Sequence, residues 1–253
     1  MKMPDLLVRG MLAGIIASVL ATGFAFAFGE PAIEGAIAVE EATAAAAPAM
    51  PAGHDHSAAA GDAEAPSVSR EVQRTVGLFT GMLALGIAFG GLFAIVFAVA
   101  RGRLGITSDR GTAFAVALLT FLALYLVPFL TYPANPPAVG HAETITARTS
   151  AYLATMLVSV LLTVAAVALH RRLAATRSGW DAAMIVGAVF GIAATAFALT
   201  MPAFREVPKA FPADVLWQFR IASIGTQLTL WCGIGLAFGL LTERAARRQP
   251  ARA

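Results

Sequence analysis

The amino-acid sequence predicts an all-α integral membrane protein built as one bundle of six transmembrane helices. Six apolar stretches run along the chain, and each has the roughly 20 residues that a helix needs to cross a hydrocarbon core of about 30 Å. The composition agrees, because 58% of the residues are hydrophobic and 13% are charged, whereas a soluble domain carries about 25% charged residues. Helices are expected because lipid offers no hydrogen-bond partner to exposed backbone groups. The predicted helices cover residues 6–28, 75–100, 112–130, 150–170, 180–201 and 221–241 of a single membrane domain, 1–253.

The basic residues are concentrated on alternate connections between these helices. Twelve of the 18 Lys and Arg residues lie at the two termini or around the connections after the second and fourth predicted helices. Because short cytoplasmic loops carry the excess of Lys and Arg, both termini are predicted to be cytoplasmic. The pI of about 9.5 follows from these clusters, so it does not indicate a nucleic-acid partner, and none is predicted.

The first apolar stretch allows two interpretations. Its basic start and the small residues Ala25 and Ala27 resemble a secretory signal with a cleavage site. The apolar run is longer than a usual signal core, and Gly10 and Gly14 have a spacing that suits helix packing. We therefore expect a retained helix, whereas cleavage would leave five spans and an external N-terminus.

Glycines spaced four residues apart recur in the predicted helices. Small residues at this spacing let helix backbones approach closely in lipid. We expect them to pack helices within one bundle, and a homo-oligomer interface is the alternative. The pairs are Gly10/Gly14, Gly77/Gly81, Gly86/Gly90, Gly187/Gly191 and Gly235/Gly239.

The longest connection, residues 29–74, is predicted to be external and to begin with a helix. Pro31 favours a helix start, since proline is common at a first helical position. On such a helix Glu30, Glu34 and Glu41 fall within about 40° of one another. This acidic face predicts an outer surface that attracts cations, and the alternative is that the acids only solvate a long loop.

Histidines and further acids on the same predicted face extend this hypothesis to a metal. His54 and His56, with the aspartate between them, suit a first-row divalent ion such as Co²⁺, Ni²⁺, Cu²⁺ or Zn²⁺. A chance match in low-complexity sequence is the alternative, since short motifs are weakly specific. The full set of predicted metal ligands is Glu30, Glu34, Glu41, His54, His56, His141, Glu206 and Asp214.

The sequence argues against an enzyme or a resident prosthetic group. It contains no P-loop for ATP, no mid-span histidine for a membrane haem, and no hydrolase triad or HExxH motif. Its single cysteine, Cys232, excludes a disulfide within one chain. No Asp, Glu or His lies in the middle of a predicted span, which weakens the case for a self-sufficient proton-coupled pump. Gln227 is the most polar mid-span residue and is expected to bond between helices.

Several long strings of residues resemble the CbtA family of predicted cobalt transporter subunits, over nearly the whole chain. The strings are RGMLAG at 9–14, EPAIE at 30–34, YLVPFL at 125–130, YPANPP at 132–137, EVP at 206–208, FPAD at 211–214, LWQFR at 216–220 and GTQ at 225–227. The resemblance implies a multi-pass protein of the bacterial cytoplasmic (inner) membrane that imports cobalt, often linked to cobalamin supply. It also implies a small one-span, histidine-bearing partner, CbtB.

The combined prediction is a membrane permease component for a divalent transition metal, with Co²⁺ as the transported ion and membrane lipid as its surroundings. Oxygen ligands alone would also suit Mg²⁺ or Mn²⁺, so cobalt does not follow from the residues themselves. The alternative is a non-transporting scaffold or metal sensor whose external loop binds metal or a partner protein. A hydrophilic path through the bundle would favour transport, and a bundle closed at its centre by Leu, Phe and Ala would favour the alternative.

Overall fold

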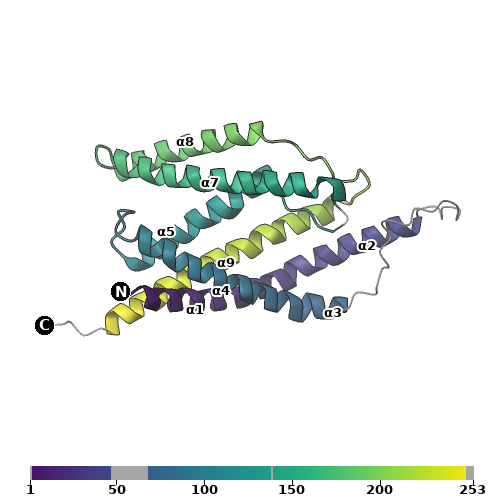
Figure 1. Ribbon diagram of the computed structural model, residues 1–253, viewed down its shortest axis with the longest axis horizontal. Helices are drawn as coiled ribbons and strands as arrows, with labels where there is room; N and C mark the ends of the chain where they lie inside the picture. The colour runs from purple at the N-terminus through teal and green to yellow at the C-terminus, as the bar shows by residue number, and fades with distance from the viewer. Residues whose placement is uncertain (1, 47–67, 138, 249–253) are drawn as a thin grey trace.

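Long apolar helices make up the computed structural model, which describes residues 2–46, 68–137 and 139–248. Six helices are long and apolar enough to cross a membrane, and the described residues contain no strand (Figure 1). This agrees with the predicted six-span bundle, and each helix extends beyond one or both of its predicted ends. The chain is a multi-pass membrane protein.

The first transmembrane helix is longer than predicted because it continues through the acidic segment. α1 (Met3–Phe24) passes into a π-helical turn, η1 (Ala25–Gly29), and then directly into α2 (Glu30–Ala46). The expected helix after Gly29 is therefore present, but it continues the first span as one rod instead of starting a separate element. The π turn ends two residues before Pro31, where a wider turn accommodates a residue that cannot donate a backbone hydrogen bond.

The next two spans are also interrupted by π turns. The second consists of α3 (Arg70–Val72), η2 (Gln73–Gly77) and α4 (Leu78–Ala100). The third consists of α5 (Asp109–Phe121), η3 (Leu122–Leu126) and α6 (Val127–Thr131). Ser108 caps α5 by accepting a hydrogen bond from the Gly111 N–H at 3.1 Å, which satisfies one of the free donors of the first turn.

The last three spans are continuous α-helices. A short 3₁₀ turn, η4 (Ala142–Thr144), leads into α7 (Ile145–Leu173), which is followed by α8 (Gly179–Thr200) and α9 (Ala213–Arg248). The two ends of the bundle differ. We call the end with connections 132–141 and 201–212 the proline-rich end, and the end with connections 101–108 and 174–178 and both termini the arginine-rich end (Figure 1). The proline-rich end is the predicted external one.

Two glycine pairs bring α1 and α4 into backbone contact. A Cβ on Gly86 would lie 2.5 Å from the Gly14 carbonyl oxygen, and a Cβ on Gly10 would overlap the Gly90 carbonyl. Gly235 and Gly239 of α9 lie in the same way against α5. The predicted packing role within the bundle is confirmed for these pairs. A Cβ on Gly187 or Gly191 of α8 would meet no atom within 4 Å, one on Gly81 would also meet none, and one on Gly77 would meet only the Val72 carbonyl of its own span, so the prediction is not met for these two pairs.

The hydrophobic core lies between α1, α4, α5 and α9, towards the arginine-rich end. Phe238 of α9 packs edge-on against Phe93 and Phe97 of α4, with ring centroids 5.2 Å and 4.8 Å apart. Trp231 stacks on Phe89 at 5.4 Å, nearer the middle of the bundle. Alanines of α1 fill the remaining space of this cluster. The centre of this half of the bundle is therefore closed by aromatic and aliphatic side chains.

The α7–α8 pair lies beside this four-helix core. The two helices pack on each other, and α7 touches η3 and α6 near the proline-rich end (Figure 1). Most of the α8 surface is apolar and exposed, for example Ile192 and Leu199. In a membrane such side chains face lipid, so the pair forms the periphery of the bundle.

Candidate functional site

Two hollows lie at the proline-rich end, and the first is a pocket of about 290 Å³. We call it the Glu30 pocket. Its walls come from η1, α2, α4, η3, α9 and the connection after α6. Its lining residues are Ala25, Gly29, Glu30, Ile33, Leu78, Tyr125, Ala134, Phe219, Ala222, Ser223, Thr226 and Gln227.

Oxygen and amide groups from three spans converge in the Glu30 pocket. Glu30 follows directly on the π turn of η1, and it is only 6% exposed. Tyr125 lies within the π turn of η3, and its hydroxyl is buried. Ser223, Thr226 and Gln227 line the α9 wall of the pocket. π turns are frequent at functional sites, and here two of them place polar side chains in one hollow.

The Glu30 carboxylate forms an ion pair with Arg70 of α3. Glu34, one turn after Glu30 along α2, pairs with Arg74, one turn after Arg70. The two spans run antiparallel, because Gly10 lies against Gly90 and Gly14 against Gly86, so the two ion pairs are not in register with each other. The Glu30 carboxylate, which the sequence predicts to be a metal ligand, is therefore paired with the guanidinium of Arg70.

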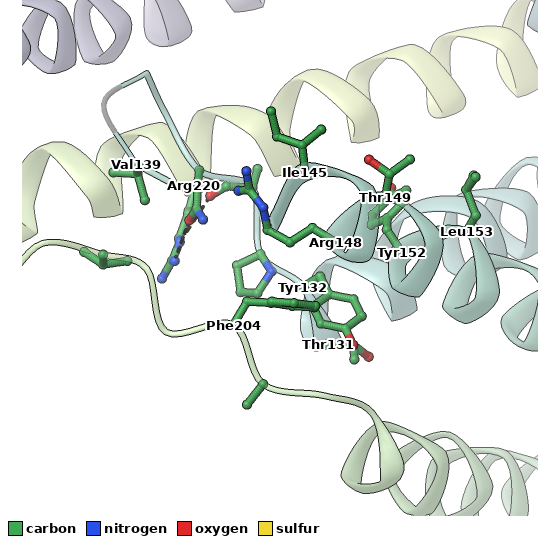
Figure 2. Close-up of a pocket in the computed structure, with 15 residues that line it drawn as sticks. Thr131, Tyr132, Val139, Ile145, Arg148, Thr149, Tyr152, Leu153, Phe204 and Arg220 are labelled. Atoms are coloured by element: carbon green, nitrogen blue, oxygen red, sulfur yellow. Dashed lines mark hydrogen bonds between the residues drawn. The ribbon is translucent and has the colours of Figure 1, made fainter. Parts of the chain in front are cut away.

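The second hollow is larger, about 520 Å³, and contains two arginines. We call it the arginine cavity; Figure 2 shows Arg148 reaching from α7 towards the Arg220 side chain of α9. Its lining residues are Thr131, Tyr132, Pro133, Ala134, Asn135, Val139, Ile145, Arg148, Thr149, Tyr152, Leu153, Ala203, Phe204, Val207 and Arg220. Ala134 also lines the Glu30 pocket, so the two hollows are neighbours.

Hydrogen bonds from the proline-rich connections hold the walls of the arginine cavity. Arg220 donates from Nε to the Ala134 carbonyl at 3.3 Å and from Nη2 to Oδ1 of Asn135 at 3.1 Å. The Tyr132 hydroxyl donates to the Pro202 carbonyl at 3.0 Å, which joins the two connections. The cavity is therefore built from both proline-rich segments.

Glu206 and His141, two predicted metal ligands, meet at the edge of the arginine cavity. The His141 backbone N–H donates to Oε2 of Glu206 at 3.0 Å, and Arg148 lies 3.4 Å from the same oxygen. A hydrogen bond from the Thr144 side chain, the His141 N–H and the charge of Arg148 lower the pKa of Glu206. Its carboxylate is thus engaged as an anchor for Arg148.

The other predicted ligands do not join these residues. Glu41 and Asp214 are exposed, on α2 and in the first turn of α9, and neither lines a hollow described above. His54 and His56 lie outside the described residues. Within the described ranges, no group of three or more His, Cys, Asp and Glu side chains could hold a metal ion.

Sequence reasoning missed the arginine partners of the acids. Arg70 and Arg74 repeat the four-residue interval of Glu30 and Glu34, but this interval does not indicate which arginine pairs with which acid. Tyr125 and Arg220 lie in two of the strings that resemble the CbtA family, YLVPFL and LWQFR. No periodic pattern indicated that Tyr125 would line the Glu30 pocket or that Arg220 would line the arginine cavity.

Comparison with known proteins identifies the family. A model of the family described as "probable cobalt transporter subunit (CbtA)" matches residues 3–243. Neither the search of curated proteins nor the search of solved structures returned a match. Because the matched range covers nearly the whole chain and includes both hollows, the chain belongs to the CbtA family of probable cobalt transporter subunits.

Proposed function

We propose that this chain forms the path by which a divalent transition metal enters the cell, and that Glu30 binds the ion. Co²⁺ is the metal that we propose, because the family description names cobalt. The observation that carries the proposal is the nearly buried Glu30, which lines the same pocket as Tyr125, Ser223 and Thr226. A buried carboxylate needs a cation for compensation. A hollow lined with oxygen donors and one negative charge suits a dehydrated divalent ion.

Arg70 supplies the compensating charge in the structure, and we propose that the metal replaces it. The Arg70 side chain is 39% exposed, so its guanidinium can move towards water when an ion enters. The same exchange applies to Glu34 and Arg74, which lie further from the pocket. Arginine would thus keep the carboxylates paired between transport events and release them to the ion.

The acids beyond Glu30 would form the entrance. Glu34 and Glu41 follow Glu30 along α2, and under the predicted orientation they lead from the external side towards the pocket. His54 and His56 would collect the metal before it reaches them. His141, Glu206 and Asp214 remain predicted ligands, although the bond of Glu206 to Arg148 leaves its carboxylate less available.

Passage beyond the pocket requires the bundle to rearrange. Leu230 and Trp231 follow Gln227 by about one turn of α9 and are buried in the core. The aromatic cluster around Phe238 fills the half of the bundle below them. Transport proteins expose a central site to one side at a time, and the pocket described above corresponds to access from the proline-rich end.

The closed core also favours a second candidate function. A membrane scaffold or metal sensor would bind the ion in the Glu30 pocket and never pass it through the bundle. The family description as a subunit implies a further component in either case, and a one-span CbtB-type protein is the partner that we would test first.

Uptake of radiolabelled Co²⁺ into proteoliposomes tests the proposal. We expect saturable uptake by the chain, alone or with the one-span partner, that Ni²⁺ blocks and Mg²⁺ does not. Glu30→Gln should reduce uptake about tenfold or more, because Glu30 is the one charged side chain among the described residues that line the pocket. Arg70→Gln should instead lower the Co²⁺ concentration for half-maximal uptake, since no guanidinium competes with the ion.

Glu40→Gln is the matched control, because Glu40 is exposed on the same helix and outside the pocket. It removes the same charge and should leave uptake unchanged. Uptake that survives in Glu30→Gln would exclude the pocket as the ion site. Co²⁺ binding that depends on Glu30, without uptake under any partner condition, would establish the sensor function.

A further inference from the structure

We propose that the arginine cavity binds a small organic carboxylate, a ligand distinct from the metal ion of the Glu30 pocket. The cavity of about 520 Å³ lies within the usual range for small-molecule sites, roughly 300–1,000 Å³. Arg148 and Arg220 are the charged side chains of its described lining. A guanidinium matches the two oxygens of a carboxylate with two parallel N–H donors.

The charge balance of the cavity calls for an anion. Arg148 has Glu206 at 3.4 Å, which compensates part of its charge. For Arg220, the described residues provide no carboxylate within the 4.0 Å of an ion pair, and its hydrogen bonds go to the neutral oxygens of Ala134 and Asn135. About one positive charge is therefore left without a counter-ion. A monoanionic carboxylate matches it better than a dianionic phosphate does.

Free hydrogen-bond donors point to the same ligand. The Nε of Arg148 is buried and has no hydrogen-bond partner in the described part of the chain. Buried donors without partners are rare and indicate a missing group such as water or a ligand. A guanidinium offers five N–H donors, so both arginines keep donors for a bound oxyanion beyond the bonds they make to protein.

The remaining walls suit the organic part of such a ligand. The rings of Tyr132 and Phe204 lie 5.8 Å apart at one side of the cavity, and Ile145 and Leu153 of α7 line another (Figure 2). An inorganic ion would leave these apolar surfaces unused. The ligand we infer therefore has one carboxylate and an apolar or aromatic body.

The cavity is organised in advance of binding. Pro133 lines the cavity, and the Pro202 carbonyl accepts the hydrogen bond from Tyr132, so a proline restricts the backbone in each connection. Gly140, at φ +125°, lies so close to Arg148 that a Cβ would be 2.5 Å from Nη1. Rigid walls lower the entropic cost of binding a ligand. The positive charge of Arg148 and Arg220 repels a free divalent cation, so the cavity is separate in function from the proposed ion site. Binding of a carboxylate here does not depend on whether the chain transports metal.

Benzoate is the probe that we would use, with the full chain purified in a neutral detergent. Benzyl alcohol has the same ring without the charge, and inorganic phosphate has the charge without the ring. Calorimetry and thermal unfolding should show that benzoate binds and raises Tm, and that both comparison compounds bind at least about tenfold more weakly. Benzyl alcohol binding as tightly as benzoate would show non-specific partitioning into apolar surroundings. Phosphate binding more tightly than benzoate would indicate a site for a lipid headgroup or free phosphate. Either result overturns the proposal.

Arg220→Gln should weaken benzoate binding about tenfold or more, because it removes the uncompensated charge. Arg205→Gln is the matched control, since Arg205 is exposed on the 201–212 connection and does not line the cavity. Equal benzoate affinity in the two variants would overturn the assignment. If Arg220→Gln does not fold, Arg220→Lys is the substitute, because it keeps the charge but loses the two parallel N–H donors of the guanidinium. An unchanged benzoate affinity in Arg220→Lys would count against a bidentate site.

Discussion

Two carboxylates at the proline-rich end are each held by an arginine, but their surroundings differ. Glu30 lies between transmembrane helices, where Arg70 is its one ion-pair partner in the described structure. Glu206 lies in a connection, where it accepts hydrogen bonds from His141 and Thr144 and also faces Arg148. An ion can replace a single, half-buried arginine side chain more readily than three partners. This difference explains why we assign Glu30 to the metal and Glu206 to the framework.

The stability of the framework should depend on the charge of Glu206. Its pKa is lowered by the Thr144 and His141 hydrogen bonds and by Arg148, so the folded state binds its proton less readily than the unfolded state. Its contribution is complete above the ordinary glutamate pKa of about 4.3 and is lost as the pH falls through the lowered value. Glu206→Gln should lower Tm in detergent by a constant amount from neutral pH to about pH 5.

The difference between wild type and Glu206→Gln should shrink below that range, as the wild-type carboxylate becomes protonated. Glu143→Gln is the control, because Glu143 is exposed in the neighbouring η4 turn. A Tm difference that grows on acidification would contradict the assigned role of Glu206.

At the scale of elements, backbone contact and π turns set the positions of the helices. Glycines bring α1 and α4 into direct contact towards their middle. The π turns η1 and η3 follow nearer the proline-rich end, and they place Glu30 and Tyr125 at the pocket. Close contact between α1 and α4 thus determines how α2 and α3 approach each other beyond it, including the pairing of Glu30 with Arg70.

A methyl group at the α1–α4 contact should therefore destabilise the bundle. In Gly86→Ala the new Cβ would lie 2.5 Å from the Gly14 oxygen and 2.7 Å from the Ser18 Cβ. Such overpacking costs about 1–3 kcal/mol, which corresponds to a Tm lower by about 5 °C in a protein of this size. Thermal unfolding in detergent measures it.

Gly81→Ala provides the comparison on the same helix, because nothing lies within 4 Å of a Cβ at Gly81. Alanine is the better helix former, so Tm should stay the same or rise slightly. Equal loss of stability in the two variants would mean that the α1–α4 contact is not the sensitive feature.

The whole molecule is polar at one end and closed at the other. The Glu30 pocket and the arginine cavity lie at the proline-rich end, while the aromatic core fills the arginine-rich half. The distribution of Lys and Arg predicts that the proline-rich end faces outside. Both hollows would then be loaded from the external side, as import requires.

Cysteine labelling tests this orientation. In a Cys232→Ala background, a membrane-impermeant maleimide should label Lys209→Cys, in the 201–212 connection, in intact cells. It should label Arg177→Cys, in the 174–178 connection, only after the membrane is permeabilised. Both positions are exposed, so access depends on the side of the membrane alone. The opposite pattern would place the hollows in the cytoplasm and contradict the import direction.

The sequence by itself determined the class of the protein, the number and approximate positions of its spans, the glycine packing in the core and the family. These features depend on local composition, on helical periodicity and on strings of adjacent residues, which are all readable along the chain. The tertiary structure decided that the first span continues through Glu30, that Arg70 pairs with this residue, and that Arg148 and Arg220 share a cavity. Such pairings depend on the rotation and height of one helix relative to another. Packing across the whole bundle sets both quantities, so no local pattern encodes them.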